Sequence, residues 1–246
     1  MDVPTSPVEV TRGLREACMS CSLHELCLPR GLSGHDLERL DTLVDRRGPH
    51  HEGDHLFRVG DRFEVIYAVR AGSYKSYTVD SEGREHVLGF HLPGDLLGLD
   101  AIYPGHHLCN ALALDTSTVC ALPYEQLSAL SGEISGLRVQ IMRLMSKDLA
   151  DTATLAGDFT AEERLAAFLV GLSSRFRERG YSPREFNLAM SRRDIANYLR
   201  LATETVSRVF ARFEKDGLIE VERRAVRLLD LPRLQNLCEA MSGLQR

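Results

Sequence analysis

The sequence predicts an α+β protein in which a β-barrel or β-sandwich is followed by one long helix and a winged helix-turn-helix. Short β-branched and aromatic segments, separated by turns rich in Gly and Asp, fill residues 52–122. Apolar residues then recur at intervals of three and four over about twenty positions, which indicates a helix. Two closely spaced short helices and a hairpin are expected after residue 190, and together they make the winged helix-turn-helix.

The composition is that of an ordinary globular protein. The 246 residues are 43% hydrophobic and 26% charged, which excludes disordered and fibrous classes. No apolar run reaches the ~20 residues of a membrane helix, and the segment after Met1 lacks the features of a signal peptide. A cytoplasmic protein without membrane contact is therefore expected. Thiols stay reduced in the cytoplasm, so clustered cysteines suggest a metal.

The charge is unevenly distributed. The net charge is −5, but residues 1–159 contain 14 Lys and Arg against 23 Asp and Glu, and residues 160–246 contain 16 against 12. The two parts therefore carry −9 and +4. This asymmetry predicts two domains with different partners, and the C-terminal one is the candidate for contacting nucleic-acid phosphates.

The first elements are expected to be a leader, a short helix and a set of strands. Residues 1–17 contain early prolines and no periodicity, so they are interpreted as a leader to the first cysteines. An amphipathic helix is expected at about residues 36–45. The strands are predicted at residues 65–69, 74–79, 86–90 and 111–122.

One long helix is predicted after the strands, from the apolar residues Ile134, Leu137, Ile141, Leu144, Met145 and Leu149. Its apolar arc is wide enough to pack on its own domain with one side and on a partner helix with the other. The alternative is a helix buried within one subunit. Gly157 and Asp158 end the pattern, and the capping-box sequence Thr160 to Glu163 begins the next helix. A domain boundary is expected there.

The C-terminal part is predicted to contain helices at residues 161–179, 191–199 and 203–215, then strands at 218–221 and 225–229. The last of these helices presents the polar residues Thr203, Glu204, Ser207 and Arg208 on its first turn and a half. In a recognition helix these positions reach base edges: Arg can bind guanine, and Glu can accept from cytosine. The alternative is a merely solvated helix face.

Further arginines are candidates for phosphate contacts, because they flank the predicted recognition helix: Arg192, Arg200, Arg223 and Arg224. Arg223 and Arg224 lie at the predicted hairpin tip. Arg200 lies in the turn between the two short helices, where a Gly able to adopt positive φ would be expected. This arginine is therefore either strained or placed to reach a phosphate.

Three cysteines with the spacing Cys18-x2-Cys21-x5-Cys27 form a compact set of soft ligands, which select zinc or an iron–sulfur cluster over hard cations. A fourth ligand must come from elsewhere, and the candidates are Cys109, Cys120, Cys238 or, for zinc, His24. A group of buried thiols and a redox disulfide are the alternatives.

The sequence contains no recognisable catalytic motif. No Ser/His/Asp set, phosphate-binding loop or paired-acid motif is present, so the chain is not expected to be an enzyme. The pairs His50-His51 and His106-His107 lie in turn-like segments without a third ligand nearby, and they are interpreted as loop residues.

The order of these features resembles the CRP/FNR family of bacterial transcription regulators. Gly-rich turns at Gly53 to Asp61 and at Pro93 to Gly98 match its cyclic-nucleotide-binding-like β-barrel, a jelly roll. The cysteine spacing together with Val119-Cys120, and Glu204-x2-Ser207-Arg208 in the recognition helix, are similar to its oxygen-sensing FNR (fumarate and nitrate reduction) branch.

The resemblance implies an oxygen-responsive regulator of anaerobic gene expression with a [4Fe–4S] cluster on Cys18, Cys21, Cys27 and Cys120. It also implies a homodimer on double-stranded DNA with an inverted repeat such as TTGAT-N4-ATCAA, and RNA polymerase as a partner. The dimerisation residues would be Ile141, Met142, Met145 and Leu149. The implied domains are residues 1–30 with the cysteines, 31–131 as sensor, 132–157 as dimerisation helix and 158–246 for DNA binding.

The family's nucleotide pocket needs an Arg followed by Ser or Thr in the loop after Gly98. No Arg occurs between Leu99 and Asp115, so no cyclic nucleotide is expected to bind. Two other readings remain at this stage. One keeps DNA binding but assigns the sensor to zinc, thiol redox chemistry or a small ligand; the other is an iron–sulfur electron carrier, which leaves the helix-turn-helix unexplained.

Overall fold

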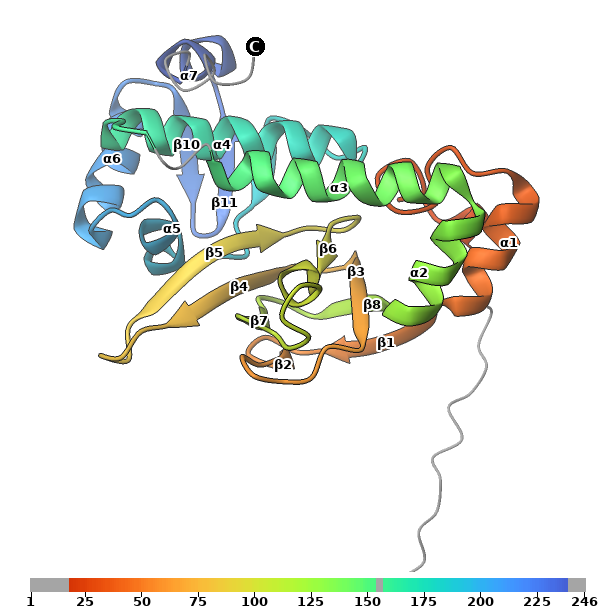
Figure 1. The fold of residues 1–246 in the computed structure, drawn as a ribbon. Helices are drawn as coiled ribbons and strands as arrows, with labels where there is room; N and C mark the ends of the chain where they lie inside the picture. Colours follow the sequence, from red (N-terminus) through yellow and green to blue (C-terminus); the bar gives the residue numbers. More distant parts are fainter. Residues whose placement is uncertain (1–17, 154–156, 239–246) are drawn as a thin grey trace, which may run out of the picture.

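The computed structural model describes residues 18–153 and 157–238, so the predicted leader at residues 1–17 lies outside the described residues. Figure 1 shows two β-sheets lying beneath one long helix, α3 (Ser135–Ala153). The cysteine segment and α1 (Gly34–Leu43) are at one end of α3, and the C-terminal helices are gathered towards its other end. The long helix therefore spans the distance between the two candidate sites.

The N-terminal half is a sandwich of two four-stranded sheets with the orders β1-β8-β3-β6 and β2-β7-β4-β5, antiparallel throughout. The sheets enclose a core that includes Val69, Tyr74 and Val119. They form a jelly-roll-like pair of layers and not a closed barrel. The strands are β1 (Asp45–His50), β2 (His55–Phe57), β3 (Val65–Ala71), β4 (Tyr74–Val79), β5 (Glu85–His91), β6 (Leu96–Leu97), β7 (Asn110–Ala113) and β8 (Ser117–Pro123).

Helices cover one end of the sandwich. The 3-10 turn η1 (Cys18–Ser20) leads to α1, whose first turn is capped because the Ser33 hydroxyl accepts from the Asp36 N–H at 3.2 Å. A second 3-10 turn, η2 (Leu99–Ala101), follows β6. The helix α2 (Tyr124–Glu133) follows β8, and its buried side chains join Leu40 of α1 and Leu137 of α3 in one apolar cluster. The cysteine segment, α1 and the start of α3 therefore share a core.

The long helix begins one residue later than its apolar periodicity suggests. Ile134 has φ −103° and ψ 98°, an extended conformation that separates α2 from α3. Its side chain is nevertheless buried with Leu137. The prediction that Ile134 belongs to the long helix was wrong, because a buried apolar residue at a helix junction keeps the same spacing as one inside the helix.

The C-terminal half is a winged helix-turn-helix, as predicted. Thr160 caps α4 with a complete capping box: its hydroxyl accepts from the Glu163 N–H at 3.2 Å, and the Glu163 carboxylate accepts from the Thr160 N–H at 2.7 Å. A small sheet of order β10-β11-β9 forms the wing. The elements are α4 (Ala161–Glu178), β9 (Glu185–Asn187), α5 (Arg192–Tyr198), α6 (Thr203–Lys215), β10 (Ile219–Glu222), β11 (Ala225–Leu228) and α7 (Leu231–Leu237).

The described helices do not include one with the length and apolar character needed to cross a membrane.

Candidate functional site

The helix-turn-helix is held together by a shared apolar core. Ile195 of α5 and Val206 and Phe210 of α6 are buried together in the C-terminal core. The turn between the helices has Arg200 with φ 56°, in the left-handed region where Gly is usual. Arg200 therefore adopts the positive φ that the sequence predicted for this turn. Its side chain is exposed.

The first turn and a half of α6 presents the predicted polar face to solvent. Glu204, Ser207 and Arg208 are exposed, and Thr203 is half-buried. The Ser207 hydroxyl donates to the Thr203 carbonyl at 3.0 Å, and Arg208 Nη2 donates to the Thr205 hydroxyl at 3.2 Å. These contacts lie along the helix surface, so they leave the guanidinium of Arg208 at an outer face from which a base edge can be reached.

The flanking arginines differ in how free they are to reach a phosphate. The Arg192 guanidinium lies 3.4 Å from the centre of the Phe210 ring, and burial lowers its pKa. Arg224 forms an exposed ion pair with Glu52 at 3.5 Å, and Arg223 is exposed at the wing tip with φ 55°. Arg193, which the sequence gave no reason to select, is exposed beside Arg192 at the start of α5.

Four thiols form a second candidate site, here called the thiol cluster: Cys18, Cys21, Cys27 and Cys120. Cys18 begins η1, and Cys21 and Cys27 lie in the loop that follows it. The Cys21 N–H donates to the Cys18 carbonyl at 3.4 Å, and the Cys27 N–H donates to the Leu23 carbonyl at 3.0 Å. Cys120 comes from β8, where it pairs with Arg46 of β1 and Ala68 of β3. The sandwich therefore supplies the fourth thiol from the sheet that faces the loop.

Electrostatics link the four thiols. Burial, together with smaller contributions from the charges of Cys120, Cys18 and Cys21, raises the pKa of Cys27 to about 12. Burial, followed by a hydrogen bond with Asp41, raises the pKa of Cys18 to about 12. Burial likewise raises the pKa of Cys120, so the thiol form is favoured at Cys18, Cys27 and Cys120.

The remaining cysteines lie apart from the thiol cluster. The Cys109 thiol donates to Asp100 at 3.5 Å inside the sandwich core, and the Cys238 thiol donates to the Gln235 carbonyl at 3.2 Å in the C-terminal core. The His24 ring nitrogen Nε2 lies 2.7 Å from the Glu25 carboxylate. Within residues 18–153 and 157–238, no three or more His, Cys, Asp or Glu residues are already arranged to hold a metal ion.

The loop of the thiol cluster is tied to α3. Buried Gln140 of α3 donates from Nε2 to the Cys27 carbonyl at 3.0 Å. The next residue, Leu28, is 1% exposed and packs with Leu137. The backbone at Cys27 and Leu28 is therefore in direct contact with the first turns of α3.

The outer face of α3 carries a bare apolar row, here called the α3 stripe: Val139, Met142, Met145 and Leu149. Met142 is 62% exposed and Leu149 is 72% exposed. Ile141 instead packs, half-buried, against the core of its own subunit. Val139 was not selected from the sequence, although it continues the same spacing.

The fold and the exposed polar face of α6 define a transcription regulator in which a jelly-roll sensor domain controls a winged helix-turn-helix. Residues 49–133 match the cyclic nucleotide-binding domain, and residues 163–237 match the Crp-like helix-turn-helix domain. The fumarate and nitrate reduction regulatory proteins of Escherichia coli (strain K12) and Salmonella typhimurium are 48% identical over 212 residues, 85% of this chain and of theirs. The chain belongs to the family of these regulatory proteins.

Solved structures agree with this assignment. FixK2 from Bradyrhizobium japonicum has a TM-score of 0.72 at 28% identity, over 79% of this chain and 96% of its own. A mutant of CooA from Carboxydothermus hydrogenoformans, at 19% identity, shares the fold with a TM-score of 0.65 over 88% of this chain and 95% of its own. The predicted class, an oxygen-responsive DNA-binding transcription regulator of the CRP/FNR family and not an enzyme, is confirmed.

Proposed function

We propose that this regulator senses oxygen through a [4Fe–4S] cluster held by Cys18, Cys21, Cys27 and Cys120. The observation that carries the proposal is the approach of Cys18, Cys21 and Cys27 to a fourth thiol on β8: the charge of Cys120 raises the pKa of both Cys18 and Cys27, and that of Cys21 raises the pKa of Cys120. Thiolate sulfur is the ligand that iron–sulfur clusters use, so the donor set fits the group. When bound, the cluster supplies a redox centre that oxygen can attack.

The chain's own residues then couple ligation to the long helix. Binding would deprotonate the four thiols and draw the Cys18–Cys27 loop towards β8. The Cys27 carbonyl is held by Gln140, and Leu28 is buried against Leu137, so the loop and the start of α3 move together. We propose that this movement sets how the α3 stripe is presented to a partner.

The proposed active form is a homodimer made through α3. Met142, Met145 and Leu149 would pack on the partner helix, whereas Ile141 would support α3 from within its own subunit. Two copies of α6 related by a two-fold axis read half-sites one helical turn apart, which requires an inverted repeat such as TTGAT-N4-ATCAA. RNA polymerase is the proposed protein partner at promoters, and the site of action is the cytoplasm.

At each half-site, Arg208 would bind guanine and Glu204 would accept from the paired cytosine, with Thr203 and Ser207 beside them. Arg200, Arg223 and Arg224 would contact phosphates, and Arg192 would do so from the side of its guanidinium not covered by Phe210. We propose the division into residues 1–30, 31–131, 132–157 and 158–246 as the corresponding sensor segment, sensor domain, dimerisation helix and DNA-binding domain.

The sensor is proposed to act without a cyclic nucleotide. In the loop Leu99–Asp115, where a phosphate would need a guanidinium, Cys109 and Asn110 are buried. Asn110 Oδ1 accepts from the Val59 N–H at 3.1 Å, and His107 stacks on Phe57 with ring centres 3.7 Å apart. The polar groups and rings of this loop are thus used for packing.

The test is anaerobic purification followed by exposure to air. Iron and acid-labile sulfide near four of each per chain, with a broad visible absorption that decays in air, are expected. Operator affinity should fall in parallel with that absorption. A protein that binds zinc tightly and keeps the same operator affinity in air would overturn the proposal.

A further inference from the structure

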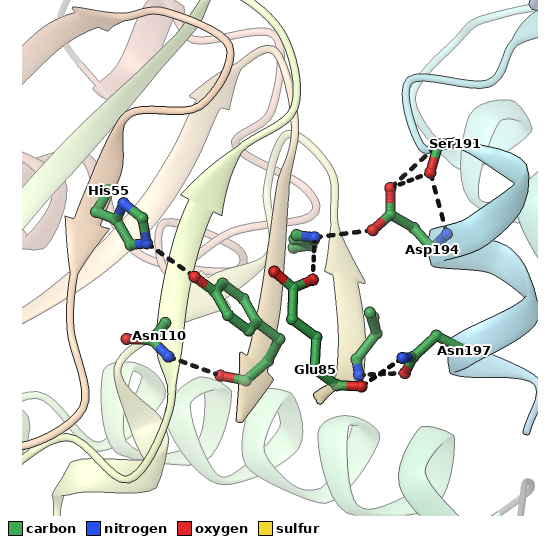
Figure 2. Close-up of polar contacts among 9 residues, drawn as sticks. His55, Glu85, Asn110, Ser191, Asp194 and Asn197 are labelled. Atoms are coloured by element: carbon green, nitrogen blue, oxygen red, sulfur yellow. Dashed lines mark hydrogen bonds and ion pairs between the residues drawn. The ribbon is translucent and has the colours of Figure 1, made fainter. Parts of the chain in front are cut away.

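A buried polar contact joins the sandwich to the first helix of the helix-turn-helix. Lys75 of β4 is 7% exposed as a residue, and its Nζ donates to Glu85 of β5 at 2.8 Å and to Asp194 of α5 at 2.8 Å. Figure 2 shows the side chains of Glu85 and Asp194, which come from the sandwich and from α5. Burial opposes the charge of Lys75, but the bonds to Asp194 and Glu85 outweigh it and raise its pKa. The ammonium therefore stays charged and links the two domains.

A second contact lies beside it. The strand β5 is at the edge of its sheet, so its outer N–H and C=O groups have no strand partner. The side chain of Asn197 in α5 supplies one: its Oδ1 accepts from the Val87 N–H at 2.7 Å, and its Nδ2 donates to the Glu85 carbonyl (Figure 2). A side-chain amide carries the donor and the acceptor of a peptide group, so it pairs with the edge as a strand would.

Aromatic rings also join α5 to the sandwich. Phe90 of β5 lies 5.2 Å from Tyr198 of α5 and 6.0 Å from Phe168 of α4, measured between ring centres. The preceding helix α4 is held separately, because Arg175 and Arg179 both bind the buried carboxylate of Asp95. The C-terminal domain is thus attached to the sandwich at two places, on α4 and on α5.

We propose that Lys75 and Asn197 are positioning residues that set the operator spacing this regulator accepts. The sandwich and α3 share one core, and a second core joins α5 and α6 to Tyr77, Val87 and Phe90 of the sandwich. Beside this apolar contact, the polar contacts of α5 with β4 and β5, here called the α5 clasp (Lys75, Glu85, Asp194 and Asn197), set the orientation of α6 relative to the dimer axis that α3 would supply. The inference rests on the proposed dimer.

Spacing is the property that this geometry controls. Adding one base pair between half-sites moves them by ~3.4 Å and rotates one by about 35° relative to the other. Two recognition helices that are held rigidly can match only one spacing between half-sites. If α5 were less firmly attached to the sandwich, α6 could adjust to several spacings. Loss of the α5 clasp should therefore change spacing selectivity more than it changes affinity for a single half-site.

The experiment compares Lys75→Met and Asn197→Ala with the unmodified protein on operators with spacers of 3, 4, 5 and 6 base pairs, anaerobically, together with a single half-site. Each variant should reduce the affinity ratio between the best spacer and its neighbours by about tenfold, a coupling typical of residues in one network. Lys75→Arg, which keeps the charge, should retain most of the ratio.

Matched controls are Arg39→Met, which removes a partly exposed cation that α1 pairs with Glu133 of α2, and Asn236→Ala on the exposed face of α7. Both should leave the ratio unchanged. Melting temperature and half-site affinity report whether a variant is folded. Equal loss of affinity on every spacer, or an unchanged ratio, would overturn the positioning role. An unmodified protein indifferent to spacing would overturn the dimer as well.

Discussion

The thiol cluster and the recognition helix are built in opposite ways. The first is assembled from a loop and a strand, and its fourth thiol, on Cys120, comes from a residue 93 positions after Cys27 in the sequence. The recognition face lies on consecutive turns of α6 and is exposed. An assembled, buried site depends on all its members at once. In a contiguous, exposed site, binding affinity decreases gradually as single side chains are removed.

Cysteine substitutions should have the largest effect. Each of Cys18→Ser, Cys21→Ser, Cys27→Ser and Cys120→Ser replaces a soft thiolate with a hydroxyl that is hard and protonated, so cluster content should fall almost to zero. Cys109→Ser and Cys238→Ser are matched controls, because both thiols are buried elsewhere. Iron and sulfide analysis under nitrogen gives the measurement. If Cys109→Ser emptied the protein while Cys120→Ser did not, the assignment of the fourth ligand would be wrong.

The α3 stripe connects the two sites and should give the next largest effect. Leu149→Asp would place a carboxylate in the proposed helix pair, where an unpaired buried charge costs about 3 kcal/mol or more, roughly a 100-fold weaker dimer. Operator affinity should fall with dimerisation, as measured by analytical ultracentrifugation and DNA titration.

Val59→Asp is the control for Leu149→Asp, because Val59 is an exposed apolar residue of the sandwich outside α3. It should leave both the dimer and its operator affinity intact. A monomeric Leu149→Asp protein that still bound the full operator with unchanged affinity would contradict the role of α3.

Changes on the recognition face should be smaller and graded. Arg208→Ala should cost about 1–3 kcal/mol on a TTGAT half-site and flatten the preference for guanine, since the bidentate contact is lost. Arg223→Ala at the wing tip should weaken all sequences alike and reduce the salt slope by about one unit. Affinities for the operator and its guanine variants at several salt concentrations separate the two effects. Reversed outcomes for the two arginines would place base recognition on the wing.

The sequence predicts the contiguous site much better than the assembled one. The spacing of Ile195, Val206 and Phe210 is enough to place α5 and α6, because a helix repeats its own core positions. The approach of Cys120 to Cys27 depends on the register of β8 against β1 and β3, which periodicity does not reveal. Only the resemblance to a family selected Cys120 over the other candidates.

Contacts between domains were the least predictable. Lys75 and Asp194 lie 119 positions apart in the sequence, and both are charged residue types that usually lie on the surface. Nothing in the local sequence separates a buried interdomain lysine from a solvated one. The break at Ile134 was missed for a related reason, since burial, and not helical conformation, sets the apolar spacing.

The smallest expected effect is that of cyclic AMP, which should be none. Residues 49–133 match the cyclic nucleotide-binding domain, but Asp100 accepts from the Leu108 N–H at 2.7 Å in the segment after Gly98, and no Arg occurs from Leu99 to Asp115. A phosphodiester placed there would meet a carboxylate and no guanidinium, and an uncompensated buried charge costs several kcal/mol. Calorimetry should therefore detect no binding, and operator affinity should be the same with and without the nucleotide. Micromolar binding of cyclic AMP would mean that the sandwich has kept a second, contiguous sensor site beside the assembled one.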